Sequence, residues 1–252
     1  DVDYNLTDRQ VLDEIIRVQS LGWILGLSSD TPLEPMEKWK RELGLNGPII
    51  AEKGSVVRLV DGRKLVANES EAYFSNLRRS LIQFMTEEKM PFYHGDVTQL
   101  IRNKPILSGM VDESVVLVQA YRRCSLNFFG RKITDTGLVI DNELVERMIG
   151  VTHQRMEVPP FELVEDYNPE YGIYILSPKN VNKREGTVKL MNEMGLSKVG
   201  MVGDSKADFV GNDIAVQYAV GNAKDELKAV SDYVAQGVYT IGVIEILLGI
   251  KS

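Results

Sequence analysis

Hydrophobic and polar positions in the first part of the chain predict helices and strands in alternation. Apolar residues at helical spacing predict a helix that ends at Gly22, and the apolar run Trp23–Leu27 is typical of a short buried strand. A second helix is expected from Pro32 to about Leu43, followed by a buried strand over Gly47–Ala51. Residues 55–67 contain Asp-Gly between two β-like runs, which predicts a hairpin.

The same alternation returns after residue 180. We expect a helix over Arg184–Met194, a strand over Lys198–Val202, a helix over Ala207–Gln217 and a strand over Tyr218–Val220. A helix, a short strand and a last helix follow between Asp225 and Leu248. Regular alternation with short loops predicts a parallel sheet with helices on both faces, and such sheets bind ligands at the carboxyl ends of their strands.

The middle of the chain has a different character, with β-like runs, irregular polar segments and fewer helices. Its expected helices cover Tyr73–Met85 and Asn142–Ile149, and its expected strands lie near Val115–Ala120, Gly137–Ile140 and Tyr171–Leu176. We therefore predict an α/β protein with a Rossmann-like, doubly wound parallel-sheet core that is split by an inserted α+β cap domain. Residues 1–72 and 179–252 would form the core and residues 73–178 the insertion.

Composition removes several classes of function. The 252 residues are 44% hydrophobic and 26% charged, as in ordinary globular proteins, and the net charge of −7 opposes binding to nucleic acid or anionic lipid. No run approaches the roughly 18 apolar residues of a membrane span, and no signal-peptide pattern opens the sequence. The single cysteine, Cys124, cannot form an internal disulfide. We expect a soluble cytoplasmic protein, for which dimerisation is compatible with the composition.

Four segments at expected strand ends carry groups suited to phosphate chemistry. Asp1 and Asp3 stand two residues apart in a polar turn, where they can share a cation or divide into a nucleophile and a proton carrier. Ser28 follows a strand and precedes a helix, a place that favours an anion. Lys183 stands at a helix start, and Gly203-Asp204 and Asp208 follow another strand.

Each of these segments also has a plain structural interpretation. The two N-terminal carboxylates fit an acidic surface turn, Lys183 fits a solvated lysine, and either later aspartate fits a helix cap. Beside Ser28, a cap made by Ser29, Asp30 or Thr31 is equally compatible with the sequence. The coincidence of all four segments at one predicted sheet edge favours a shared site.

Taken in order, these motifs resemble those of the haloacid dehalogenase superfamily of phosphatases. Asp-x-Asp-x-Asn-Leu-Thr opens the chain, Ser28 follows an apolar strand, Lys183 begins a helix, and residues 203–208 read Gly-Asp-Ser-x-x-Asp. The core stretches 46–54, 220–223 and 229–234 resemble the Cof-like subgroup with a large inserted cap, including archaeal phosphoglycolate phosphatases.

The resemblance implies a role for each motif residue. Asp1 would take the phosphoryl group as an aspartyl phosphate, and Asp3 would serve as general acid and base. Ser28, beside Ser29, would bind the phosphoryl oxygens, and Lys183 would neutralise their charge. Mg²⁺ would be held by Asp1, by Asp3 through its carbonyl group and by Asp204, with Asp208 in support. These requirements agree with the physics of phosphoryl transfer and of hard cations.

Some positions depart from the family pattern, and two other functions stay open. Tyr4 stands where glycine is usual, Asp30 adds a carboxylate near the anion site, and Ala207 replaces an asparagine. A phosphomutase, or a silent phosphate-binding regulatory module, would use the same residues. The substrate of a phosphatase would be phosphoglycolate or a sugar phosphate. Candidate cap contacts, each also explicable as a solvated side chain, are Tyr93, Tyr121, Arg122, Arg123 and Arg131.

Overall fold

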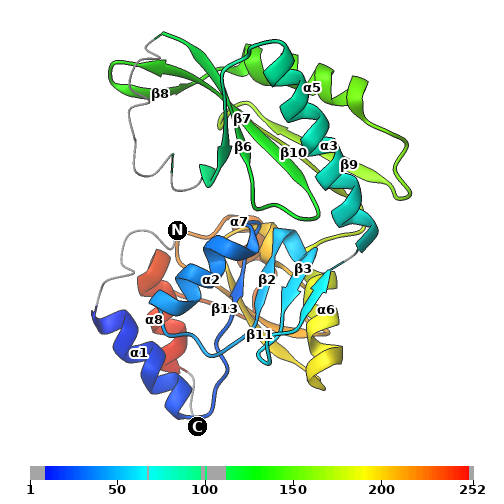
Figure 1. The fold of residues 1–252 in the computed structure, drawn as a ribbon. Coiled ribbons are helices and arrows are strands. Elements are labelled where there is room, and N and C mark those ends of the chain that lie inside the picture. The colour runs from blue at the N-terminus through cyan, green and yellow to red at the C-terminus, as the bar shows by residue number, and fades with distance from the viewer. Residues whose placement is uncertain (1–8, 67, 98–99, 101–111, 250–252) are drawn as a thin grey trace. The chain divides into compact units, whose positions relative to one another are not determined.

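The computed structural model describes residues 9–66, 68–97, 100 and 112–249. The chain divides into two compact units (Figure 1). Unit 1 comprises residues 1–65 and 181–252, and unit 2 comprises residues 66–180. Asp1 and Asp3 lie outside the described residues.

The first part of unit 1 builds a mixed sheet flanked by helices. Its elements are α1 (Arg9–Ser20), β1 (Leu27–Ser28), α2 (Leu33–Glu42), β2 (Ile49–Ala51), η1 (Glu52–Gly54), β3 (Val56–Arg58) and β4 (Lys64–Val66, whose last residue belongs to unit 2). The strands are ordered β1-β2-β3-β4. β1 runs parallel to β2 with Ser28 opposite Ile50, so both strands deliver their following residues to the same edge.

The second part of unit 1 restores the β/α alternation. Its elements are α6 (Lys183–Met194), β11 (Val199–Gly203), η2 (Lys206–Asp208), β12 (Ala215–Ala219), α7 (Asp225–Lys228), β13 (Tyr233–Val234) and α8 (Tyr239–Gly249). The three strands pair in parallel in the order β11-β12-β13. Helix α1 packs against α8 at opposite ends of the sequence, through a core of Val11, Ile15, Val18, Leu43 and Leu247.

Unit 2 is a mostly antiparallel sheet with helices, in which β5 pairs in parallel with β6, as expected for an α+β module. Its described elements are α3 (Asn68–Glu87), β5 (Phe92–Gly95), β6 (Ser114–Gln119), β7 (Leu126–Thr134), β8 (Gly137–Ile140), α5 (Asn142–Arg155), β9 (Leu163–Asn168) and β10 (Ile173–Pro178). The strand order is β5-β6-β7-β10-β9, with β8 on β7. Apolar side chains of α3 and α5, among them Phe74, Leu81 and Met148, pack with Phe128 and Tyr174 of the sheet.

Two predicted elements of unit 1 were wrong. The helix over residues 207–217 is replaced by the short η2 and by β12, because Phe209 is extended, Gly211 has a φ of +99° and residues 215–219 pair with β11. The buried strand over Trp23–Leu27 shrinks to Leu27–Ser28. Asn46 instead bonds Leu25 N–H and the Trp23 carbonyl oxygen.

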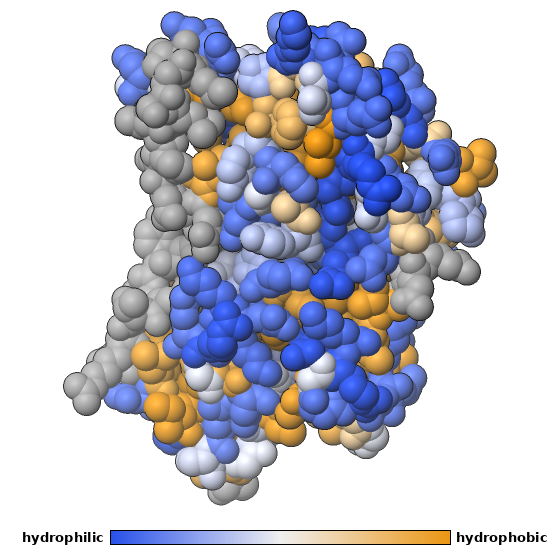
Figure 2. Space-filling view, viewed as in Figure 1, coloured by the Kyte–Doolittle hydropathy of each residue, from blue (hydrophilic) through white to orange (hydrophobic). Residues whose placement is uncertain are grey.

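The surface is mostly hydrophilic (Figure 2), as expected from the share of charged residues in the sequence. Figure 2 shows a face that is mostly hydrophilic, interrupted by hydrophobic residues. Side chains on α1 and α8 contribute to the exposed apolar set, with Ile16 62% and Ile241 59% exposed. Within the described part of the chain, no helix is long and apolar enough to cross a membrane.

Candidate active site

The β1 strand ends in two serines whose hydroxyl groups have different surroundings. Ser29 Oγ accepts a hydrogen bond from Thr31 N–H at 3.1 Å and donates one to Thr31 Oγ1 at 3.0 Å, so it folds the loop back on itself. Ser28 Oγ is buried and has no hydrogen-bond partner among the residues described. A buried hydroxyl without a partner is costly unless a ligand satisfies it. Ser28 is therefore the serine available to a bound group.

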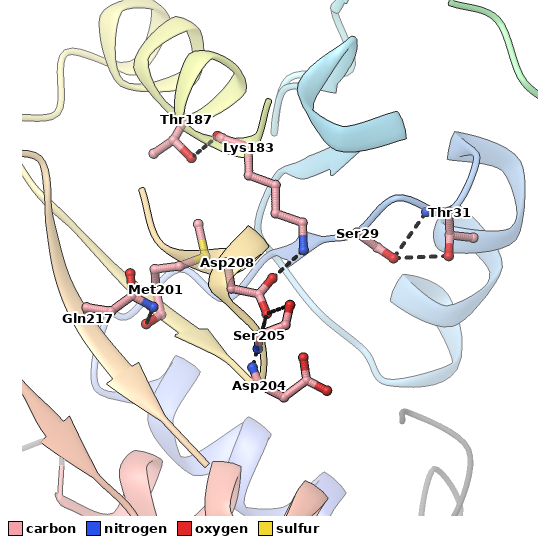
Figure 3. Close-up of polar contacts among 9 residues, drawn as sticks. All are labelled: Ser29, Thr31, Lys183, Thr187, Met201, Asp204, Ser205, Asp208 and Gln217. Atoms are coloured by element: carbon pink, nitrogen blue, oxygen red, sulfur yellow. Dashed lines mark hydrogen bonds and ion pairs between the residues drawn. The ribbon is translucent and has the colours of Figure 1, made fainter. Parts of the chain in front are cut away.

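Lys183 lies in the first turn of α6, where a cation opposes the helix dipole. The N-cap is Asn182, whose side-chain oxygen accepts from Glu185 N–H at 2.9 Å. The ammonium group of Lys183 forms an ion pair with Asp208, and the two side chains are only 12% and 10% exposed. Figure 3 shows Lys183 reaching from α6 toward Asp208, with Ser29 on the other side of its ammonium group. Asp208 thus offsets the unfavourable position of this cation.

Asp208 also organises the loop after β11. Its Oδ2 accepts from the N–H groups of Asp204 at 3.0 Å and Ser205 at 3.2 Å, while Oδ1 accepts from Lys183. Both carboxylate oxygens therefore have protein partners. The role of Ser205 was not predicted, although its three-residue spacing from Asp208 is the signature of a capping box.

Gly203 is required by close packing. A Cβ at Gly203 would overlap the Cβ of Asp208, and would lie 2.6 Å from its Oδ2. The φ angle of Gly203 is not in the left-handed region, so the turn does not need the backbone freedom of glycine. Glycine is needed here because any side chain would collide with Asp208.

Asp204 contrasts with Asp208. Its backbone is fixed on both sides, because its N–H donates to Asp208 and its carbonyl oxygen accepts from Lys224 N–H at 2.8 Å. Its carboxylate makes no hydrogen bond or ion pair within the part of the chain that the structure describes. The structure therefore brings Ser29, Lys183, Asp204 and Asp208 into one region of unit 1 (Figure 3), where the Asp204 carboxylate has no partner among the described residues.

The described residues contain no group of three or more His, Cys, Asp or Glu side chains that could hold a metal ion by itself. Asp204 still fits a hard cation, since its carboxylate oxygens have no partner among the described residues and its backbone is fixed. The other predicted carboxylate ligands, Asp1 and Asp3, lie outside the described residues.

Two predicted cap contacts are buried in unit 2. Arg131 is 8% exposed and donates to the carbonyl oxygens of Gly130, Tyr171 and Gly172. Arg122 is 4% exposed and donates to Ser125 Oγ at 2.9 Å. A solvated role was wrong for both arginines, and their contacts stabilise turns of unit 2.

The lowered pKa of Asp208 predicts how the free energy of unfolding depends on pH. Burial alone would raise the pKa of Asp208, but the charge and hydrogen bond of Lys183 and the N–H groups of Asp204 and Ser205 together lower the pKa of this carboxyl. The ionised Asp208 carboxylate therefore stabilises the folded protein. This stabilisation is complete above the pKa of about 4 that the carboxyl has in the unfolded chain, and it is lost as the pH falls through the lower pKa of the folded state. We expect Asp208→Asn to lower the free energy of unfolding by about 3 kcal/mol at pH 7.

Urea unfolding of the wild type and Asp208→Asn between pH 2 and pH 7 measures this difference. It should shrink as the pH falls below about 4. Asp213→Asn is the matched control, because Asp213 pairs with Arg184 of the same helix but is 63% exposed. At pH 7 the control should change stability much less. A difference between the wild type and Asp208→Asn that stays constant down to pH 2 would contradict the assignment.

Comparison with known proteins shows the family of this chain. Residues 3–247 match the family described as haloacid dehalogenase-like hydrolase, so the chain belongs to that family. The solved structures that resemble the chain agree with the predicted α/β core with an inserted module.

The individual relatives share at most about a third of their aligned residues with this chain. Phosphoglycolate phosphatase 1 of Saccharolobus solfataricus is 33% identical over 128 residues, which cover 50% of this chain and 48% of that protein. The chain thus aligns with about half the length of this curated relative. A Thermoplasma acidophilum crystal structure is similar with a TM-score of 0.62 and 22% identity, covering 98% of this chain and 94% of the other. The structure of a haloacid dehalogenase-like hydrolase from Bacteroides thetaiotaomicron is similar with a TM-score of 0.64 and 15% identity, covering 99% of this chain and 97% of the other. These two similarities establish the fold alone.

Proposed function

We propose that this chain is a Mg²⁺-dependent phosphatase that hydrolyses a small organic phosphate monoester through an aspartyl phosphate on Asp1. Three groups of unit 1 carry the proposal, namely the buried Ser28 hydroxyl at the end of β1, the Lys183 ammonium group in the first turn of α6 and the Asp204 carboxylate after β11. A hydrogen-bond donor, a cation and a free carboxylate are the groups that a phosphoryl group and its counterion require.

In the proposed reaction, a carboxylate oxygen of Asp1 attacks phosphorus while the bond from phosphorus to the ester oxygen breaks. Asp3 gives its proton to the departing alkoxide, so the alcohol leaves neutral. Asp3 then takes a proton from water, whose oxygen attacks phosphorus and releases inorganic phosphate and the Asp1 carboxylate. Ser28 donates to a phosphoryl oxygen throughout, and Lys183 neutralises the charge on the transferring group.

Asp204 would hold Mg²⁺ together with Asp1 and the carbonyl oxygen of Asp3, and the ion would supply charge neutralisation of the phosphoryl oxygens. Asp208 would act differently, because both of its oxygens already accept hydrogen bonds from the protein. We assign to Asp208 the positioning of Lys183 and of the Asp204 loop. This assignment refines the supporting role expected from the resemblance.

The inserted residues 73–178 are proposed as the cap that selects the leaving group. Phosphoglycolate is the first substrate to test, because the curated relative at 33% identity is a phosphoglycolate phosphatase; sugar phosphates come second. A small phosphate ester is the proposed partner. A cytoplasmic location and a homodimer stay predictions from the sequence.

Release of inorganic phosphate from a panel of esters tests the proposal. The panel contains phosphoglycolate and hexose phosphates, each assayed with Mg²⁺ and with excess chelator. Turnover that needs Mg²⁺ supports the phosphatase, and the best ester identifies the substrate class. Formation of an isomeric phosphate in place of free phosphate would indicate a phosphomutase. Tight phosphate binding without turnover of any ester would indicate the regulatory module.

Asp204→Asn is expected to raise the Mg²⁺ concentration for half-maximal activity by roughly tenfold or more, because a neutral amide is a weaker ligand for a hard cation than a carboxylate. Titration of activity with Mg²⁺ at saturating substrate measures the shift. Asp213→Asn, which changes the same charge on an exposed surface of unit 1, should leave the titration unaltered. An identical Mg²⁺ requirement in Asp204→Asn and the wild type would remove Asp204 from the metal site.

A further inference from the structure

The turn between β2 and β3, residues Glu52–Gly54, has an unusual backbone. Its three residues have φ values of +48°, +57° and +106°, all in the left-handed region. Such values are unfavourable for the side-chain-bearing Glu52 and Lys53. Strained backbone of this kind persists only where surrounding contacts hold it, and it gathers at functional sites. We call these three residues the β2–β3 turn.

One side of the β2–β3 turn is bonded to the loop that carries the site serines. Glu52 N–H donates to the Thr31 carbonyl oxygen at 3.2 Å, and Lys53 N–H donates to the Ser29 carbonyl oxygen at 3.3 Å. Ser29 N–H in turn donates to the Ile50 carbonyl oxygen at 2.9 Å, just before the turn. The backbone of the serine loop is therefore fixed to the β2–β3 turn.

The other side of the turn packs against the first turn of α6. A Cβ at Gly54 would overlap the carbonyl oxygen of Asn182, the N-cap residue directly before Lys183. From the α6 side, a Cβ at Gly186 would lie 2.7 Å from Gly54 Cα. Two glycines thus let the turn and the helix approach backbone to backbone. Because Gly186 N–H bonds the Asn182 carbonyl oxygen at 3.1 Å, this contact falls on the turn of helix that carries Lys183.

We propose that the β2–β3 turn is a positioning clamp that sets the separation between the Ser28–Ser29 loop and Lys183. The turn is bonded to one of these elements and in backbone contact with the other, and the two glycines fix the spacing sterically. The clamp rests on the proposed function, because its purpose is to hold a hydrogen-bond donor and a cation around one phosphoryl group. None of the three turn residues needs to contact the substrate.

The separation matters because phosphoryl transfer depends on placement. The protein has little covalent chemistry to contribute beyond its nucleophile, so catalysis rests on groups held at fixed positions around phosphorus. A displacement of about 1 Å can cost roughly a hundredfold in rate. A methyl group inserted between Gly54 and Asn182 would force a displacement on this scale, because backbone atoms on both sides cannot rotate away.

Gly54→Ala tests the clamp, with Gly62→Ala as its control. Both glycines have left-handed φ values, +106° and +93°, and both lie in turns of the same sheet, so both substitutions add backbone strain. The three atoms nearest to a Cβ at Gly62 would all belong to the flexible end of the Arg58 side chain, the nearest at 3.6 Å. We expect Gly54→Ala to lower kcat/KM by roughly tenfold to a hundredfold and to weaken inhibition by inorganic phosphate in parallel. Gly62→Ala should leave both unchanged.

Gly186→Ala approaches the same contact from the other side without a φ penalty. Alanine favours a helix more than glycine does, so this variant should fold even where Gly54→Ala does not. Gly150→Ala, within helix α5 and with open space around the added methyl group, is its control. Gly186→Ala should reproduce the kinetic loss, and Gly150→Ala should not.

Crystal structures of the four variants separate this proposal from the proposed function. The distance between the Ser29 and Lys183 Cα atoms should grow in Gly54→Ala or Gly186→Ala and stay at the wild-type value in both controls. An unchanged distance, or wild-type kinetics and phosphate inhibition in both Gly54→Ala and Gly186→Ala, overturns the clamp. A wild type that releases no phosphate overturns the proposed function instead, whatever these distances are.

Discussion

Replacement of Asp1 by Asn is expected to reduce phosphate release by about four orders of magnitude or more. The amide of asparagine is a poor nucleophile and cannot form the acyl phosphate that divides hydrolysis into two steps. Substrate binding should survive, because Ser28 and Lys183 would still contact the phosphoryl group. Phosphate release at saturating Mg²⁺ and rapid-quench trapping of labelled phosphoenzyme measure the two halves of this prediction.

Asp13→Asn is the matched control, since Asp13 lies exposed on α1 and its replacement changes the net charge by the same amount. This control should keep wild-type activity and accumulate the labelled intermediate. Substantial turnover by Asp1→Asn would show that water attacks the ester directly, or that another residue is the nucleophile. In either case the aspartyl-phosphate mechanism would fail while the family assignment would stand.

Local sequence pattern pointed to the four candidates that lie among the described residues. Ser28, Lys183 and Asp204 each stand where an apolar strand ends or a helix begins, and such boundaries are visible in a few residues of sequence. Asp208 follows Asp204 by four residues and ends the short η2. The choice between Ser28 and Ser29 required three dimensions. Only the structure shows that Ser29 bonds Thr31, while the Ser28 hydroxyl is buried without a partner among the described residues.

Features that depend on contacts between distant segments were not predicted. The β2–β3 turn and Asn182 are far apart in the chain, and the sequence of either segment alone does not indicate that Gly54 and Gly186 are in contact. The helix predicted over residues 207–217 was wrong for a related reason. Their apolar spacing fits a helix, but pairing of Ala215–Ala219 with the whole of β11 outweighs that local preference.

Lys183→Met is expected to lower kcat by about a thousandfold, because the cation acts on charge that develops in the transition state. It should also lower the free energy of unfolding by about 3 kcal/mol, since it leaves the buried carboxylate of Asp208 without its cation. Steady-state kinetics and urea unfolding at pH 7 measure the two losses. Arg184→Met, which removes the next cation along α6 but from an exposed pair, should alter both far less.

The double variant Lys183→Met/Asp208→Asn distinguishes the catalytic from the structural contribution of this ion pair. Removing both charges leaves no uncompensated ion in the interior, so the double variant should be more stable than Lys183→Met alone. Its activity should stay as low as that of Lys183→Met, because stability regained without the ammonium group does nothing for the transferring phosphoryl group. Recovery of activity together with stability would mean that Lys183 serves the fold alone, and the charge-neutralising role proposed for it would be wrong.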